Sequence, residues 1–295
     1  MPGLSITDLP WPTEANRIDL LARGFETEQD AASEDTLRAR AVRAQVAKHG
    51  GEWGDRAALL ADLLDPNLRS ELPVTLASSR CFRDQRIRVL SELLRLLNES
   101  EADRSSLVRA DVVKPKLACD VFDLQDCDPN RIFSEFRADL LRVAPANTKK
   151  GSAERAVKRK GFLLAAVHGE FDPTAEIYQP HFHVAATQDY VDLVDRLRNL
   201  KGYRPTELVR TPVRITRDIY NLPGAITYLL KSYWPQRPFL PLGSDGALKR
   251  PRTHQRIDEP FHTEVLMWLD RCDLSDLVLL MGIRVGKNGL TTTNK

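Results

Sequence analysis

The segment "EIYQPHFHVAAT", residues 176–187, decides both the fold and the chemistry of this chain. Its short apolar run, bounded by a turn signal, predicts a β-strand. Because side chains alternate between the two faces of a strand, His181 and His183 project from the same face, roughly 7 Å apart along the chain. Imidazoles at the centre of a sheet are costly to bury unless they are hydrogen-bonded or bind something. The two histidines are therefore either a hydrogen-bonded structural pair or part of a metal site.

The preceding segment supplies candidates for a third ligand. "GFLLAAVHGEF", residues 161–171, predicts a second strand, and "DPTAE" predicts a turn that folds the two strands together. His168 and Glu170 share one face of this strand and lie opposite the histidine pair. Two imidazoles with a carboxylate or a third imidazole suit Mn²⁺, with Mg²⁺ as a harder alternative. Glu170 is the preferred third ligand because hard cations prefer oxygen, and His168 is the alternative.

The segments around this hairpin complete an α+β unit. Strand patterns occur at 112–124 and 207–219, and helix patterns at 128–143, 188–200 and 222–234. The order β-α-β-β-α-β-α predicts a ferredoxin-like, split βαβ arrangement, an antiparallel sheet with helices on one face. We expect a helical accessory region at 1–110, the sheet domain at 111–240, and a Pro- and Gly-rich linker with two short helices at 241–295.

Composition limits the class of protein. The chain has 295 residues, of which 42% are hydrophobic and 28% charged, with a net charge of +2, as in ordinary globular proteins. No run approaches the ~20 apolar residues of a membrane span, and the first residues do not resemble a secretory leader. Its four cysteines lack CxxC spacing, which favours reduced thiols and disfavours a disulfide framework. We therefore expect a cytoplasmic protein without a membrane partner.

A second motif lies in "AITYLLKSYW", residues 225–234. Tyr228 and Lys231 are three residues apart on the expected helix and therefore neighbours on its surface. A phenol, with a pKa of about 10, is a poor nucleophile at neutral pH until a cation stabilises the phenolate. A lysine and a divalent metal would provide that help. Alternatively, Tyr228 simply fills an amphipathic helix, with its hydroxyl at the surface.

Taken together and in this order, "PHFHV" and "YLLK" resemble the motifs of the HUH endonucleases, which include rolling-circle replication initiators, relaxases and single-strand transposases. The resemblance covers residues 111–236 and is strongest to plasmid and phage initiators. It implies that His181 and His183 bind a metal, with Glu170 or His168 as third ligand. It also implies that Tyr228 attacks single-stranded DNA to form a 5′-phosphotyrosine, while Lys231 stabilises charge. Ser232 stands where some members carry a second tyrosine, so a single-tyrosine enzyme is expected.

The expected partner is single-stranded or hairpin DNA at an origin. A basic segment is either a solvated loop or a contact to the DNA backbone, and its cations are Lys149, Lys150, Arg155, Lys158, Arg159 and Lys160. Arg210, Arg214 and Arg217 add positive charge near the fourth strand. Because no GxxxxGK[ST] motif occurs, a host helicase and polymerase would act in trans. A mobilisation relaxase, a transposase and a DNA-binding regulator that has lost catalysis are the alternatives.

Overall fold

The N-terminal part of the protein is helical, as expected. The structure is a computed structural model, which describes residues 4–68, 71–144, 159–217, 219–238, 240–242, 247–249 and 255–293. Short 3₁₀ turns precede the first helix. The helices of this part are α1 (Ile18–Leu21), α2 (Glu28–Val46), α3 (Gly51–Leu64), α4 (Ser79–Glu99) and α5 (Glu101–Ser106). The apolar stripe predicted for α4, from Ile87 to Leu97, is buried.

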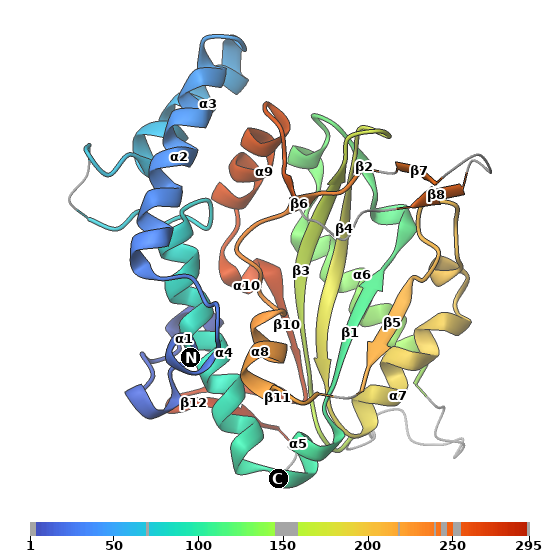
Figure 1. Cartoon of the computed structure of the whole chain (residues 1–295). Coiled ribbons are helices and arrows are strands. Elements are labelled where there is room, and N and C mark those ends of the chain that lie inside the picture. Colours follow the sequence, from blue (N-terminus) through green and yellow to red (C-terminus); the bar gives the residue numbers. More distant parts are fainter. Residues whose placement is uncertain are drawn as a thin grey trace.

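Side-chain caps fix the starts of α2 and α4, and one of them joins the two helices. Thr27 begins α2 in a capping box with Asp30, which satisfies free N–H groups of its first turn. Asp35, buried on α2, accepts hydrogen bonds from the Ser78 hydroxyl (2.7 Å) and the Ser79 amide at the start of α4. A carboxylate at a helix N-terminus is stabilised by the unpaired amides and the helix dipole. The long helix α4 therefore has a fixed position beside the sheet (Figure 1).

The sheet contains four strands around the histidine hairpin, as predicted, but the first begins and ends earlier than the predicted 112–124 and the fourth is shorter than 207–219. They are β1 (Val108–Val113), β3 (Leu163–Asp172), β4 (Ile177–Ala186) and β5 (Val213–Thr216). Their order is β5-β1-β4-β3, with every neighbour antiparallel. The strand β6 (Pro235–Gln236) adds to β3 in parallel, so the sheet as a whole is mixed, and it curls. Smaller strands extend it: β2 (Cys119–Asp120) on β4 and β9 (Gln255–Arg256) on β6.

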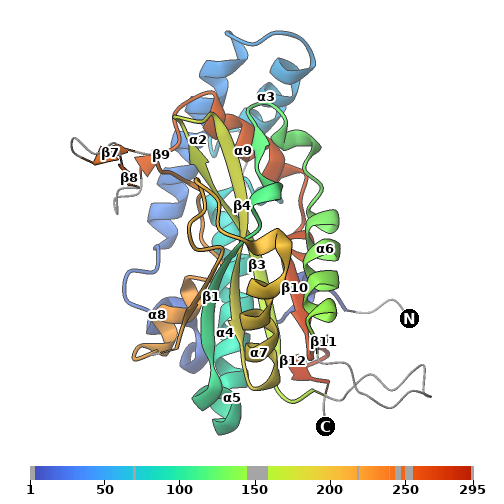
Figure 2. The same ribbon diagram turned by 90° about the vertical axis from the view of Figure 1, so that its right-hand side faces the viewer.

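The two faces of the sheet are covered by different parts of the chain. The helices α6 (Pro129–Arg142) and α7 (Asp189–Arg196) pack on the face that bears Phe182, whose ring centroid lies 4.0 Å from that of Phe136. The helix α6 begins at Asp128 with Pro129 in its first turn, as predicted. The opposite face carries the histidines and is crossed by the chain that follows α8 (Leu222–Thr227), with α2 and α4 behind it (Figure 2).

The predicted helix 222–234 is wrong in its second half, because α8 ends at Thr227. Arg86 of α4 donates to the Leu230 carbonyl, and Arg38 of α2 donates to the Ser232 carbonyl. These two carbonyls therefore accept hydrogen bonds from buried guanidinium groups instead of from backbone amides of a helix, and the chain here is irregular. Tertiary contacts therefore override a sequence pattern that favours a helix.

The C-terminal region also departs from expectation. The helices α9 (Phe261–Asp270) and α10 (Leu274–Leu277) confirm the two predicted short helices, but the following residues form strands. The strand β10 (Val278–Met281) pairs with the free edge of β3, and β11 (Ile283–Gly286) forms a hairpin with β12 (Gly289–Thr292). A short apolar run fits a buried strand as well as a helix, and the open edge of β3 decides between them. A separate hairpin joins β7 (Leu240–Leu242) and β8 (Ala247–Lys249).

One cluster of buried side chains runs through the helical part, the sheet and the C-terminal region, from Ile6 to Leu290. Within the described ranges, no helix has the length and apolar character needed to cross a bilayer. The N-terminal helices therefore share a core with the sheet, and this shared core fixes the loop that crosses the histidine face.

Candidate metal centre

Three histidines converge on the face of the sheet that the chain after α8 crosses. His168 of β3 lies directly opposite His181 of β4, and His183 is the next residue on that face. The Nδ1 atom of His168 is 3.2 Å from Nε2 of His181, which is 3.3 Å from Nε2 of His183. One nitrogen from each ring lies within 4.8 Å of the others, and all three side chains are buried. The cluster could therefore bind a metal ion.

The tautomers of two of these histidines support metal binding. His168 Nε2 lies 2.8 Å from the Tyr233 carbonyl, and His181 Nδ1 lies 3.2 Å from the Gln179 carbonyl. A carbonyl only accepts, so both of these nitrogens carry the proton and donate it. The remaining nitrogens, His168 Nδ1 and His181 Nε2, then face each other as lone pairs at 3.2 Å. A neutral pair in this arrangement has no hydrogen bond between its rings, and a shared cation would relieve the repulsion.

The spacing and charge state also fit an ion. Nitrogens about 2.1 Å from one metal, at octahedral or tetrahedral angles, lie roughly 3.0–3.4 Å apart. Burial lowers the pKa of His181 to about 4 and moves the pKa of His183 in the same direction. Both rings are therefore neutral near pH 7, and the neutral imidazole is the form that coordinates a metal.

Glu170, the preferred third ligand from the sequence, lies elsewhere on the same face. It pairs with Gln179 in the strand register, one step beyond the histidines, and its carboxylate lies 3.2 Å from the Arg237 guanidinium. Among the described residues, the group with metal-binding geometry contains His168 and not Glu170. The geometry therefore favours the alternative that the sequence left open, a third imidazole.

Asp111 is a site residue that the sequence analysis missed. It faces His183 across the β1–β4 pairing, with its Oδ1 atom 3.8 Å from His183 Nε2. This buried oxygen has no hydrogen-bond partner within the part of the chain that the structure describes. The signal was present in "VRADVV", residues 108–113, where Arg109 and Asp111 alternate with apolar residues. The pattern at 112–124 predicts a strand that begins after Asp111, whereas β1 begins at Val108.

Tyr228 and Lys231 lie beside the histidines although they do not share a helix. The Tyr228 ring centroid is 4.4 Å from that of His183, and the Lys231 ammonium lies 3.9 Å from the Tyr228 centroid. The Arg109 guanidinium carbon lies 4.2 Å from that ring, within cation–π distance. Burial raises the pKa of Tyr228 and lowers the pKa of Lys231 to about 8. The structure thus brings together the histidine and tyrosine motifs.

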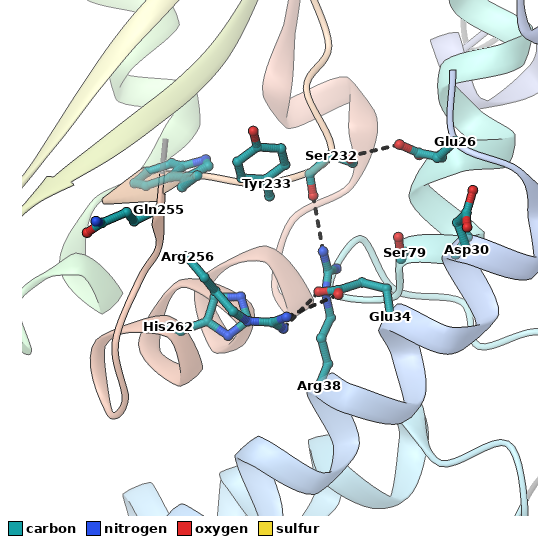
Figure 3. Close-up of a pocket in the computed structure, with 12 residues that line it drawn as sticks. Glu26, Asp30, Glu34, Arg38, Ser79, Ser232, Tyr233, Gln255, Arg256 and His262 are labelled. Atoms are coloured by element: carbon teal, nitrogen blue, oxygen red, sulfur yellow. Dashed lines mark hydrogen bonds and ion pairs between the residues drawn. The ribbon is translucent and has the colours of Figure 1, made fainter. Parts of the chain in front are cut away.

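A hollow of about 400 Å³ lies behind the chain that carries Tyr228 and Lys231. It is rich in charge, but its charges are matched (Figure 3). Glu34 pairs with Arg38 at 2.8 Å and with Arg256 at 2.8 Å. Glu26 accepts from Ser232 and pairs with Arg86. These interactions tie the N-terminal helices to the loop, which gives the hollow a structural role.

The basic segment predicted to contact DNA is only partly described. Lys149, Lys150, Arg155 and Lys158 lie outside the described residues, whereas Arg159 and Lys160 lie just before β3. The backbone amide of Lys160 donates to Asp189 at 2.7 Å. The four cysteines carry free thiols, as expected.

Comparisons of the chain with protein-family models, with curated proteins and with solved structures found no match. The site must therefore be interpreted from its own geometry.

Proposed function

We propose that this protein is a metal-dependent endonuclease of the HUH type, which nicks and rejoins single-stranded DNA through Tyr228. The observation that carries the proposal is the tilted contact of the Tyr228 ring with His183, at 4.4 Å between centroids, beside a buried three-histidine cluster. The histidine and tyrosine motifs are 45 residues apart in the sequence, from His183 to Tyr228. Their order along the chain does not require them to be close in space, so their proximity is independent support for the proposal. The 4-1-3-2 order of the four central strands, all antiparallel to their neighbours, is that of a ferredoxin-like sheet and supports the same class.

The charges around Tyr228 suit a phosphodiester. Arg109 and Lys231 flank its ring. Burial and the charge of Asp111 raise the pKa of Tyr228, and the charges of Arg109, Arg237 and Arg214 partly oppose this rise by favouring the phenolate. Two buried nitrogens, Arg109 Nε and Arg237 Nε, have no hydrogen-bond partner among the described residues. Buried polar atoms without partners are rare in native proteins and point to a ligand that satisfies them. An anionic phosphate would provide the acceptors for these donors.

The proposed step is a transesterification at phosphorus. The Tyr228 oxygen forms a bond to the scissile phosphorus, and the bond from phosphorus to the 3′-oxygen breaks. Asp111, whose charge acts on Tyr228, takes the phenol proton and returns it to the departing 3′-oxygen, which leaves as a hydroxyl. Lys231 and Arg109 balance the charge of the phosphate. The reverse reaction rejoins the strand without another energy source.

His168, His181 and His183 would hold the metal, which would supply Lewis-acid polarisation of the phosphate when bound. Three imidazoles suit Mn²⁺ better than Mg²⁺, because Mg²⁺ strongly prefers oxygen ligands. The resemblance to plasmid initiators gives the biological role that we propose, the initiation of rolling-circle replication. Host helicase and polymerase would act on the nicked origin.

The test is whether Tyr228 becomes covalently attached to DNA. A single-stranded oligonucleotide labelled on the 3′ side of the nick should leave its label on the wild-type protein in a denaturing gel with Mn²⁺. Tyr228→Phe keeps the ring and removes the nucleophile, so DNA binding should persist while the adduct disappears. Tyr233→Phe, five residues along the same chain, is the matched control and should retain the adduct. An adduct in Tyr228→Phe, or its absence in the wild type on all origin substrates, would overturn the proposal.

A further inference from the structure

The histidine face continues past the strands to an edge groove, which we define by Arg104, Arg109, Arg217, Tyr220 and Asn221. Two hollows of about 500 and 490 Å³ form it. They share the residues 219–221 between β5 and α8, so one adjoins the other. The first is lined by α5 and this loop, and the second reaches Arg109.

The groove leads to the proposed nucleophile. Arg109 lines it at one end and also lies over the Tyr228 ring, at 4.2 Å. In the strand register, Thr216 is paired with Arg109 and Arg214 with Asp111. These two residues of β5 therefore lie on the same face of the sheet as the histidines. Arg109 therefore connects Tyr228 with the groove, at the edge of the sheet formed by β1 and β5.

The chemistry of the groove is positive and aromatic. Arg104 and Arg217, which line it, are exposed, and neither forms an ion pair with another described residue. Among the described residues that line it, Glu101 is the one acidic side chain. Tyr220 is 95% exposed, so its ring is free to stack on a ligand. Exposed rings flanked by unpaired arginines are the elements with which proteins bind single-stranded nucleic acid, by stacking bases and by neutralising phosphates.

We infer that the edge groove binds the single-stranded DNA beside the scissile phosphate, with a base stacked on Tyr220 and phosphates on Arg104 and Arg217. This inference rests on the proposed function and assigns it a substrate path distinct from the basic segment at 149–160. A duplex is disfavoured as occupant, because its bases are already stacked on one another and offer no free face to Tyr220.

Binding of a fluorescein-labelled single-stranded oligonucleotide, followed by anisotropy over a range of salt concentrations, tests the groove. Tyr220→Ala should weaken binding roughly 5- to 100-fold, and Tyr220→Phe should bind like the wild type, because stacking requires only the ring. Replacing Arg104 and Arg217 together by Gln should reduce the slope of log Kd against log salt by roughly 0.7 for each arginine.

The matched control replaces Arg131 and Arg198 by Gln. Both arginines are exposed, and they belong to α6 and the turn after α7, which cover the opposite face. This control should leave both affinity and slope unchanged. Equal losses in the control and groove variants would show nonspecific electrostatics and overturn the inference. Equal affinity of the wild type for duplex and single strand would also overturn it.

A nicking assay on the same variants separates the two proposals. If the wild type nicks DNA and the groove variants nick and bind it equally well, the groove inference is wrong and the proposed function stands. Single-strand binding that depends on Tyr220 and the arginines, without any cleavage by the wild type, would reject the enzyme and support the groove.

Discussion

Two charged regions lie on either side of the chain from Tyr228 to Trp234, and they differ in whether their polar atoms have partners. Behind this chain, Glu34 is held by Arg38 and Arg256, and Glu26 by Arg86 and Ser232. In front of it, Asp111 Oδ1, His183 Nδ1, Arg109 Nε and Arg237 Nε are buried without a hydrogen bond to another described residue.

The difference separates a structural network from a binding site. A buried network whose members satisfy one another contributes to the fold and has nothing left to offer a ligand. A cluster with unmatched donors, acceptors and lone pairs reduces stability and is kept for what it binds. On this basis, we interpret the hollow of Figure 3 as a structural contact between the N-terminal helices and the chain after α8, and the histidine face as the candidate site.

The largest expected effect lies in the matched network. Arg38→Met removes a buried guanidinium that serves Glu34 and two backbone carbonyls, of Ala77 and Ser232. We expect the free energy of unfolding to fall by about 3–5 kcal/mol, measured by urea denaturation. Arg40→Met, on the exposed side of the same helix, should change it by less than about 0.5 kcal/mol. Similar values for both would show that the network does not stabilise the fold.

The next effect distinguishes the two candidates for the third ligand. His168→Ala should weaken Mn²⁺ binding by more than about 100-fold, since removing a direct ligand costs more than removing an outer-shell group. Glu170→Gln should leave the affinity within about 3-fold. Isothermal titration calorimetry measures both. A loss in Glu170→Gln with retention in His168→Ala would restore the carboxylate as ligand.

A smaller effect is expected for Asp111. Asp111→Asn keeps the shape of the side chain but cannot take the phenol proton, so single-turnover nicking should slow by about 100-fold. The affinity for Mn²⁺ should change by about 10-fold at most. Asp120→Asn, an exposed aspartate on β2, serves as control and should nick normally. Normal nicking by Asp111→Asn would remove this residue from the proposed step.

The smallest effect has the opposite sign. His183→Leu replaces an unmatched buried imidazole by an apolar side chain of similar volume. We expect the metal-free protein to gain about 0.5–2 kcal/mol in unfolding free energy, while Mn²⁺ no longer raises its melting temperature. Differential scanning calorimetry with and without Mn²⁺ measures both quantities. A loss of stability in the metal-free variant would indicate that His183 has a structural role.

The sequence predicted the local features of the site well, because they depend on short-range geometry. The period of two places His181 and His183 on one face, and the turn at 172–176 places His168 opposite them. The cap at Asp128 and the apolar stripe of α4 were likewise readable, since caps and helical periodicity need only neighbouring residues.

Features that depend on distant partners required the tertiary structure. Register decided that Asp111 faces His183, and packing decided that His168 rather than Glu170 belongs to the cluster. The end of α8 was set by Arg86, which lies 144 residues before the carbonyl it binds. The strand β10 forms because its backbone pairs with the edge of β3, which is far away in the sequence. Local propensities are worth tenths of a kcal/mol to about 1 kcal/mol per residue, and buried hydrogen bonds from distant residues outweigh them. The sequence by itself thus determined the local candidates, His181, His183, His168, Tyr228 and Lys231. The tertiary structure decided which candidates meet, and it added Asp111 to them.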